Sequence, residues 1–450
     1  SGISLAQSQG LFYVLIESGT YFENIDLIDG INVFGGMDGS FYLRDPSNYS
    51  TVLEGSAGSP TVSAVGITSP TSVEGLSIFS PSTELDSASV IALYIEDSSD
   101  QLSFFDNVII ADDAEDGLDG SNGQDGSTGL DGDNGAGGAV YNCNSPLIGG
   151  NGGTNSCSSG AVDGGNGASI LCPSNTQTQP SGSDGDGLNF GAGGTGSCDA
   201  SLGNWGCSTC YISGCWEAGG NGVIGGDGSD GDGGDGAQTS GVLSGLTWLA
   251  EDGLSGILAD DGSGGGGGGA GAGGENTCNQ NQNHAGGTGA GAGAGGCGGE
   301  GGIYGTGGGS SFAVFVNCTS CSSLPLFMDN DIGAGDGGNG GDGGDGGLGG
   351  LPGFGGLGGL ADRSNAFCAE DGGDGGDGGF GGDGGGAGGG AGGNSYAVYI
   401  QGYTPDPLWI DADNDLDGGL PGLGGRGGRG GSRSNDGGNG GNGANGDQNW

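Results

Sequence analysis

The residues best suited to chemistry are the carboxylates of a short run near the C-terminal end. Asp413, Asp415 and Asp417 alternate with other residues and precede Gly418. A D-x-D-x-D-G run is the first half of a loop that ligates Ca²⁺ through carboxylate oxygens. The bidentate Glu that completes such a loop would fall at Gly424, so the motif is incomplete.

A second acidic turn occurs earlier, where Asp329 and Asp331 follow an apolar run. Carboxylates this close repel one another unless a cation or hydrogen bonds compensate. We therefore take these two, Asp411 and the three carboxylates of the run above as candidate Ca²⁺ ligands, with calcium as the candidate cofactor. The alternative is that these Asp side chains cap turns without any ion.

Twelve cysteines are the other reactive residues. An even count in an acidic, Gly-rich chain without Lys predicts disulfides, and therefore an extracellular or cell-surface location. Two C-x-x-C pairs, 207–210 and 318–321, could bind zinc, but they lie far apart and His284 is the sole histidine. Spacing does not determine connectivity, so every cysteine is a disulfide candidate: Cys143, Cys157, Cys172, Cys198, Cys207, Cys210, Cys215, Cys278, Cys297, Cys318, Cys321 and Cys368.

The sequence offers no convincing catalytic set. His284 lies in the polar stretch NQNQNHAGG, so a Ser/His/Asp arrangement is not indicated. A glycosidase needs two paired carboxylates, and Asp106 with Asp112 or Asp113 could be drawn that way, but such pairs arise by chance in an acidic chain. We predict that the protein is not an enzyme.

The charge balance excludes several partners. The chain has 55 acidic and 5 basic residues and a formal net charge of −50. Such a chain repels nucleic acid and anionic membrane surfaces. No run of about 18 apolar residues is present, so no membrane span is predicted.

Long stretches of the chain are built from glycine-rich triplets. From Asp336 to Leu360 every third residue is Asp, Asn, Leu or Phe, and nearly everything between is Gly. This period fits neither a helix nor a strand, but it fits an extended helix of three residues per turn, of the polyglycine II type. Its backbone groups must bond to neighbouring segments. A disordered linker is the alternative, and the constant phase argues against it. Collagen is excluded because Gly usually fills two positions of each triplet.

Residues 1–115 differ from these arrays. Short β-rich runs are separated by Gly and Asp turns, which favours a coil of parallel strands, and residues 1–9 are predicted to form a capping helix. The pattern GTYFENIDL in 19–27 has Gly, Tyr, Glu, Ile and Leu at alternate positions. This stretch resembles the right-handed parallel β-helix of pectin-lyase-like proteins. The resemblance implies the fold but not an activity, since this fold hosts lyases, hydrolases, adhesins and spacers.

A module of two apolar strands, an Asp/Asn turn and a Gly array starts at Ser89, Ser310 and Asn394. We predict an all-β protein: a right-handed parallel β-helix whose rungs are interrupted by polyglycine II bundles. The predicted domains are a β-helix in 1–115, Gly/Cys-rich excursions with interspersed strands in 116–309, and further rungs in 310–450. Those later rungs are 310–332 and 394–416, each followed by a triplet array.

The alternation of rungs and arrays resembles secreted glycine-rich surface proteins of bacteria. The arrays alone are similar to mycobacterial PGRS domains, springtail antifreeze proteins and phage tail-fibre tips. This resemblance implies a non-catalytic extracellular structural protein, a surface fibre or filament subunit or an adhesin stalk, with self-association as the expected interaction. The alternatives are a calcium-dependent adhesin whose partner is a surface glycan, an ice-binding protein, and a β-helix enzyme acting on polysaccharide.

Overall fold

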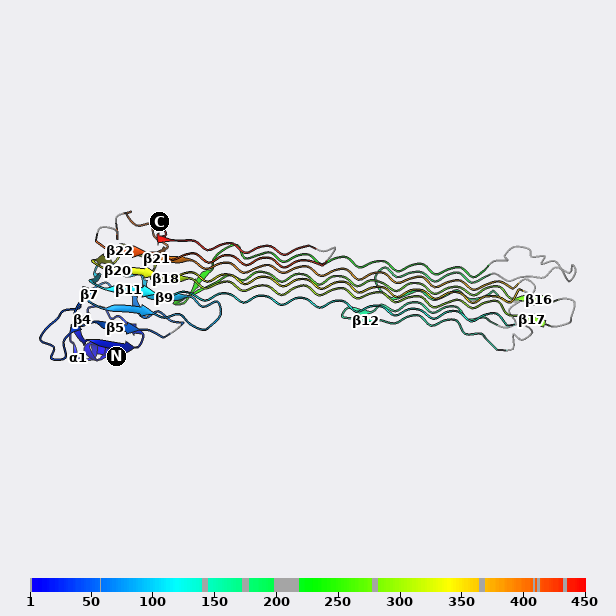
Figure 1. The fold of residues 1–450 in the computed structure, drawn as a ribbon, viewed down its shortest axis with the longest axis horizontal. Helices are drawn as coiled ribbons and strands as arrows, with labels where there is room; N and C mark the ends of the chain where they lie inside the picture. The colour runs from blue at the N-terminus through cyan, green and yellow to red at the C-terminus, as the bar shows by residue number, and fades with distance from the viewer. Residues whose placement is uncertain are drawn as a thin grey trace.

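The chain folds into a block of β-sheets from which a long rod of glycine-rich segments projects (Figure 1). The computed structural model describes residues 2–56, 58–139, 145–171, 178–197, 218–276, 282–363, 369–407, 409–410, 413–431 and 435–450. Both ends of the chain lie at the block, and the rod runs away from them.

The block is all-β and is built from three parallel sheets. Their strand orders are β1-β4-β7-β10-β19, β2-β5-β8-β11-β20-β22 and β23-β21-β18-β9-β6-β3. From β1 to β11 the chain visits the first, second and third sheet in turn, so successive passes add neighbouring strands to each sheet. The strands of the first sheet are β1 (Tyr13–Glu17), β4 (Asn32–Met37), β7 (Thr71–Glu74), β10 (Leu102–Phe105) and β19 (Leu326–Met328).

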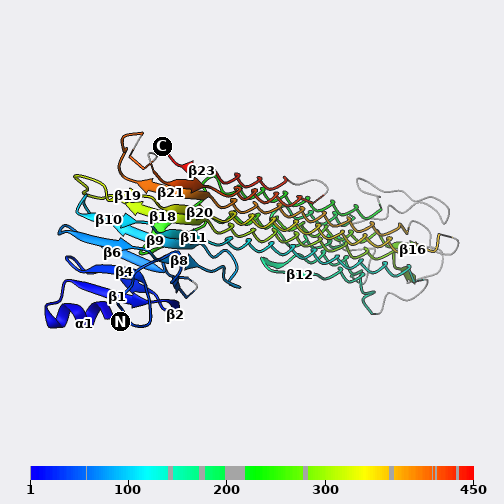
Figure 2. The same ribbon diagram turned by 60° about the vertical axis from the view of Figure 1, so that its left-hand side comes forward.

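The other two sheets supply the connections to the rod. The second sheet contains β2 (Gly19–Phe22), β5 (Thr51–Glu54), β8 (Ser77–Ser80), β11 (Val108–Ala111), β20 (Asp331–Ala334) and β22 (Asp415–Asp417). The third contains β3 (Ile25–Asp26), β6 (Val62–Val65), β9 (Val90–Glu96), β18 (Ser311–Asn317), β21 (Ser395–Gln401) and β23 (Asn445–Gln448). The chain enters the rod after β11, β20 and β22 and returns to β18, β21 and β23, so every excursion starts at the second sheet and ends at the third (Figure 2).

Corners with positive φ divide stretches that the sequence suggests are single strands. The apolar run 72–79 becomes β7 and β8 because Gly75 turns with φ 66°, and the run 102–110 becomes β10 and β11 because Asp106 turns with φ 54°. This backbone region is open to Gly and is visited by Asp more than by most residues. The predicted strand pattern is thus confirmed in outline, with tighter corners than expected.

Apolar residues at matching register form the core. Ile78, Ile109 and Ile332 are successive partners in the second sheet, and all three are fully buried. Burying each such side chain contributes about 1.5–3 kcal/mol. The predicted N-terminal helix is present as α1 (Gly2–Gln9), which buries Ile3 and Ala6 against the β1 end of the block.

The rod consists of extended segments with three-residue spacing between their lateral hydrogen bonds. Its main segments are 113–138, 149–154, 162–168, 179–186, 191–197, 218–237, 253–272, 285–310, 336–361, 369–393, 418–431 and 435–443. Antiparallel hairpins join or flank some of them: β12 (Ser156–Cys157) with β13 (Gly160–Ala161), β14 (Val242–Ser244) with β15 (Thr247–Leu249), and β16 (Gly274–Asn276) with β17 (Gln282–His284).

The segment 285–310 lies at the centre of the rod. The N–H groups of the three residues 289–291 donate to carbonyls of 162–168, 369–393 and 113–138 at 2.9–3.1 Å. Their carbonyls accept from 149–154, 253–272 and 336–361 at 2.8–3.0 Å, so three residues bond to six different segments. This is how a buried backbone without sheet or helix satisfies its polar groups.

Candidate functional site

The parallel sheets bring together two of the predicted calcium ligands. Asp331 and Asp415 occupy paired positions on β20 and β22, and both are exposed. Asp417 is paired with Gly333 and is also exposed. The two acidic motifs therefore lie side by side, although 84 residues separate the paired aspartates.

The other predicted ligands lie in the turns that precede these strands. Asp329 forms a corner with φ 54°, and Asp413 is exposed in the equivalent turn. Asp411 lies outside the described residues. Within the part of the chain that the structure describes, no three of these carboxylates come close enough to share one ion. Calcium stays a prediction.

Asparagines organise these turns. Asn330 Oδ1 accepts from the N–H and Nδ2 of Asn107, at 3.1 and 3.0 Å, and Asn414 Oδ1 accepts from the N–H and Nδ2 of Asn330, both at 2.9 Å. Asn107 and Asn330 are buried. Each asparagine thus links one pass of the chain to the next. Sequence reasoning missed this ladder, although the dipeptide Asp-Asn recurs at 106–107, 329–330 and 413–414.

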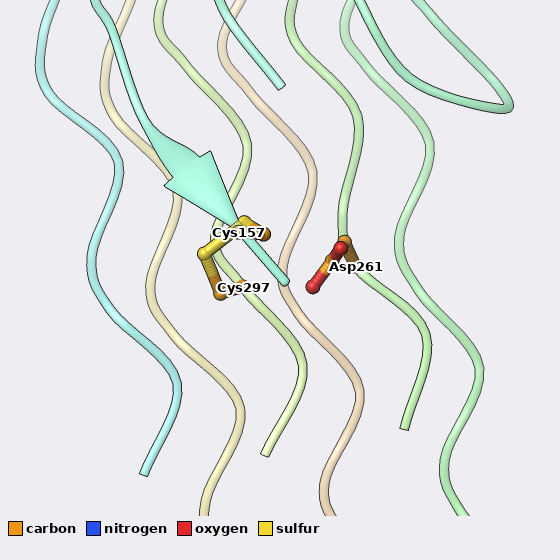
Figure 3. A group of neighbouring side chains, drawn as sticks. All are labelled: Cys157, Asp261 and Cys297. Carbon is orange, nitrogen blue, oxygen red and sulfur yellow. A yellow bond between two sulfur atoms is a disulfide. The ribbon is translucent and has the colours of Figure 1, made fainter. Parts of the chain in front are cut away.

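Cys157, Cys297 and Asp261 form the one cluster of potential metal ligands among the described residues (Figure 3). The two cysteines are joined as a disulfide across 140 residues, so they offer no thiolates to an ion. Asp261 Oδ1 accepts from the Gly298 N–H at 2.7 Å. The cluster is a covalent link between the β12–β13 hairpin and the central segment.

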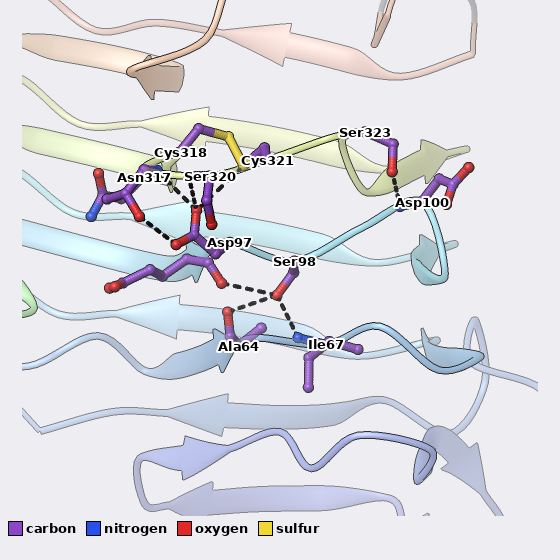
Figure 4. The surroundings of a disulfide bond; sticks show 12 residues. Ala64, Ile67, Asp97, Ser98, Asp100, Asn317, Cys318, Ser320, Cys321 and Ser323 are labelled. Atoms are coloured by element: carbon purple, nitrogen blue, oxygen red, sulfur yellow. Dashed lines mark hydrogen bonds between the residues drawn. A yellow bond between two sulfur atoms is a disulfide. The ribbon is translucent and has the colours of Figure 1, made fainter.

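A second disulfide joins Cys318 and Cys321 (Figure 4). It closes a turn of the block, so this C-x-x-C pair provides no zinc ligands. The Asp97 carboxylate accepts from Thr319 and Ser320 of the turn, and the hydrogen bond from the Thr319 side chain is the largest of the effects that lower the pKa of Asp97. Four of the candidate cysteines are therefore paired in the structure. The others lie outside the described residues: Cys143, Cys172, Cys198, Cys207, Cys210, Cys215, Cys278 and Cys368.

The acidic residues of the triplets accept backbone hydrogen bonds. The Asp342 N–H donates to Asp119 Oδ1 at 2.8 Å, and Asp342 Oδ1 accepts from the Arg426 N–H at 2.6 Å. Equivalent rows occur every three residues along 113–138 and 336–361. These side chains therefore close the surface of the rod, a role beyond the metal binding and turn capping that the sequence suggests for Asp.

The contact between 369–393 and 336–361 shows how closely the acidic side chains match the backbone N–H groups that they accept from. Asp377 and Asp383 of 369–393 accept from the N–H groups of Gly355 and Gly349. Midway between them, Phe380 offers no acceptor. The residue at the corresponding position of 336–361 is Pro352, which has no N–H to satisfy. The position that lacks an aspartate acceptor is therefore the position that lacks a backbone N–H.

The distal half of the same face is apolar. Five side chains of 336–361 that share one phase are 49–73% exposed: Leu348, Leu351, Phe354, Leu357 and Leu360. We call them the apolar stripe. Beside it lies a shallow groove of about 680 Å³, whose lining includes Ile224, Leu351, Pro352, Phe354 and Phe380. The segment 418–431 covers the proximal half of this face, where it bonds to residues 336–346, and its bonds do not continue along the stripe.

An aromatic cluster joins the rod to the block. Trp248, on the β14–β15 hairpin, lies 5.5–5.9 Å from the rings of Phe312, Phe315 and Tyr399 on the third sheet. The hairpin belongs to the rod excursion, so this cluster ties the base of the rod to the sheet. Tyr94 packs in the same cluster, and burial raises its pKa to about 12.

His284 is not in an exposed polar loop. It ends β17 and is fully buried, and burial lowers its pKa. The described residues include no helix with the length and hydrophobicity that a bilayer span requires.

Comparisons with known proteins identify no relative: no family model, curated protein or solved structure matches this chain.

Proposed function

We propose that this is a non-catalytic extracellular structural protein whose rod acts as a stiff spacer, as in a surface fibre or filament subunit or an adhesin stalk. The observation that carries the proposal is the bonding of residues 289–291 to six neighbouring segments. A lattice in which each segment is held on several sides resists bending, because bending must stretch many hydrogen bonds at once. A flexible Gly-rich linker has no such bonds.

The finer architecture belongs to the same proposal. The three sheets are the faces of a right-handed parallel β-helix, supported by the recurring visits of the chain to each sheet. The rod is a polyglycine II bundle, supported by its hydrogen-bond period of three. At about 3.1 Å per residue, the segment 113–138 extends about 80 Å.

The first experiment measures length and order together. Small-angle scattering and negative-stain microscopy of the intact protein are expected to give an elongated particle with a rod about 80 Å long. Hydrogen exchange is expected to be slow in 285–310 and 336–361. Random-coil exchange in these segments would refute the spacer function.

The block has two different ends, which suggests how subunits join. The helix α1 packs against β1, whereas β22 and β23 are the last strands of their sheets at the opposite end. Edge strands carry unpaired backbone groups that can pair with another chain. We propose end-to-end self-association through this end. Negative-stain images of concentrated protein are expected to show filaments, and monomers alone would count against the idea.

A second candidate function is calcium-dependent glycan binding, the role of an adhesin tip. The pairing of Asp331 with Asp415 favours it, because two adjacent carboxylates can share a cation. Glycan-array binding that is lost on adding a chelator and in Asp415→Asn would support this candidate. Binding that ignores both changes would reject it.

A further inference from the structure

The apolar stripe reads the same in both directions. Its residues are Leu, Leu, Phe, Leu and Leu at three-residue spacing, with Phe354 at the centre. Exposure rises from 49% at Leu348 to 73% at Leu360. Side chains of this size and exposure form a patch on the order of 500 Å², the size of the largest patches on monomeric proteins, which are often functional.

Most backbone donors beside the stripe are already used, so another glycine segment would find few partners there. The N–H groups of Leu348, Phe354 and Leu357 already donate to side chains of 113–138. Those of Gly355 and Gly358 donate to aspartates of 369–393, and Pro352 has none. The carbonyls of the five stripe residues accept from 113–138. An added strand needs free backbone groups, and most donors of this surface are already used, which favours an occupant that binds through side chains.

We propose that the stripe binds a second copy of this chain, antiparallel, about a twofold axis through Phe354. Phe354 then packs on the partner's Phe354, Leu351 on the partner's Leu357, and Leu348 on the partner's Leu360. A twofold contact requires a self-complementary surface, and a palindromic stripe is one. The contact buries about 1,000 Å² in total, the lower limit for a specific interface.

Charge favours the antiparallel arrangement over a parallel one. The β-sheet blocks of the two copies, which are both acidic, then lie at opposite ends of the dimer. The same axis brings Arg363, whose side chain is 59% exposed and pairs with Glu370 and Asp371 of its own chain at 2.9 and 2.8 Å, level with the partner's Asp345, nine residues from Phe354 on the other side. In a parallel pair Arg363 would face the partner's Arg363, and the two like charges would repel each other. Asp125 and Asp131 lie beside the stripe and oppose approach of another acidic rod.

Salt therefore distinguishes this partner from a cationic one. Screening weakens the repulsion between two acidic rods, so added NaCl strengthens the dimer. A basic peptide or an organic cation bound to the same carboxylates would instead be released by salt. The rod surface is distinct from the end of the block, so this dimer forms whether or not the end-to-end filaments proposed above exist.

Sedimentation equilibrium of the full chain at low and high NaCl tests the proposal. A monomer–dimer equilibrium that tightens with salt is expected. Phe354→Asp keeps the backbone N–H and sets two carboxylates against each other on the axis, so it should weaken dimerisation at least about 30-fold, the loss typical of a central hot spot. The control Leu423→Asp changes a leucine that is 62% exposed but lies on 418–431, outside the stripe, and should change nothing. Monomers at every salt concentration, or a Phe354→Asp dimer as tight as the parent, would overturn the proposal.

Photo-oxidative dityrosine formation tests the register. In Phe354→Tyr the two new phenols meet on the axis, and mass spectrometry should find a 354–354 crosslink. In Leu348→Tyr the new phenol faces the partner's Leu360, so no 348–348 crosslink is expected. Self-crosslinking at position 348 would contradict the antiparallel arrangement.

Discussion

Replacing Gly291 with Ala tests whether the rod is a close-packed lattice. A Cβ added at Gly291 would lie 1.8 Å from the Asn151 carbonyl oxygen, which is backbone and cannot swing aside. Ala290 and Ala292 occupy the neighbouring positions, so the effect depends on where this one carbon points and not on a general need for Gly.

The expected loss of local stability follows from the hydrogen bonds that the substitution breaks. The segment 149–154 must move away, which breaks the bonds from Gly150 N–H to Gly289 O at 3.0 Å and from Gly153 N–H to Ala292 O at 2.8 Å. A buried polar group left without a partner costs about 1–3 kcal/mol, and overpacking costs about the same. We expect a loss of about 2–4 kcal/mol in the local opening free energy, or about 30- to 1,000-fold faster exchange at Gly150 and Gly153.

Native-state hydrogen exchange of the intact protein measures this change. The control is Gly441→Ala, whose added Cβ would come no closer than 3.4 Å to any atom, an ordinary contact. It should leave exchange unchanged or slow it slightly, because Ala restricts the unfolded chain. Equal effects of the two substitutions would refute the idea that neighbouring segments touch at van der Waals distance.

The remaining predictions concern the block and its links to the rod. Trp248→Ala should lower the free energy of unfolding by about 3–5 kcal/mol in urea titrations, whereas an unchanged midpoint would mean that the hairpin contributes no anchoring. Asn330→Leu should cost about 2–4 kcal/mol, because several buried backbone and amide groups lose their partner, and equal stability of variant and parent would contradict the ladder. Reducing the Cys157–Cys297 disulfide should speed exchange in the β12–β13 hairpin, by the equivalent of about 2–4 kcal/mol. Because its folded pKa lies below the ordinary value of 3.8, Asp97 contributes stability above pH 3.8 that is lost as the pH falls below it, and Asp97→Asn should flatten that part of the acid-unfolding curve.

Much of the local structure could be predicted from the sequence. Three-residue spacing in 336–360 predicts an extended segment with lateral bonds, and such bonds occur on several sides of 336–361. The continuous β-rich run in 90–96 predicts a strand, and β9 has these bounds. The role of the triplet aspartates was not predicted, because a carboxylate that caps a neighbouring backbone looks, in sequence, the same as one in solvent.

The sequence by itself determined the period, the phase and the chemical character of each segment. It could not determine which segments become neighbours, because a three-residue repeat pairs equally well with any other in many registers. The tertiary structure decided this through the sheets. Val108 of β11 pairs with Asp331 of β20, and the same offset of 223 residues continues into the rod, where Asp113 accepts from the Asp336 N–H. The strands have unique side-chain partners and therefore one register, and each rod segment continues from a strand that is already aligned.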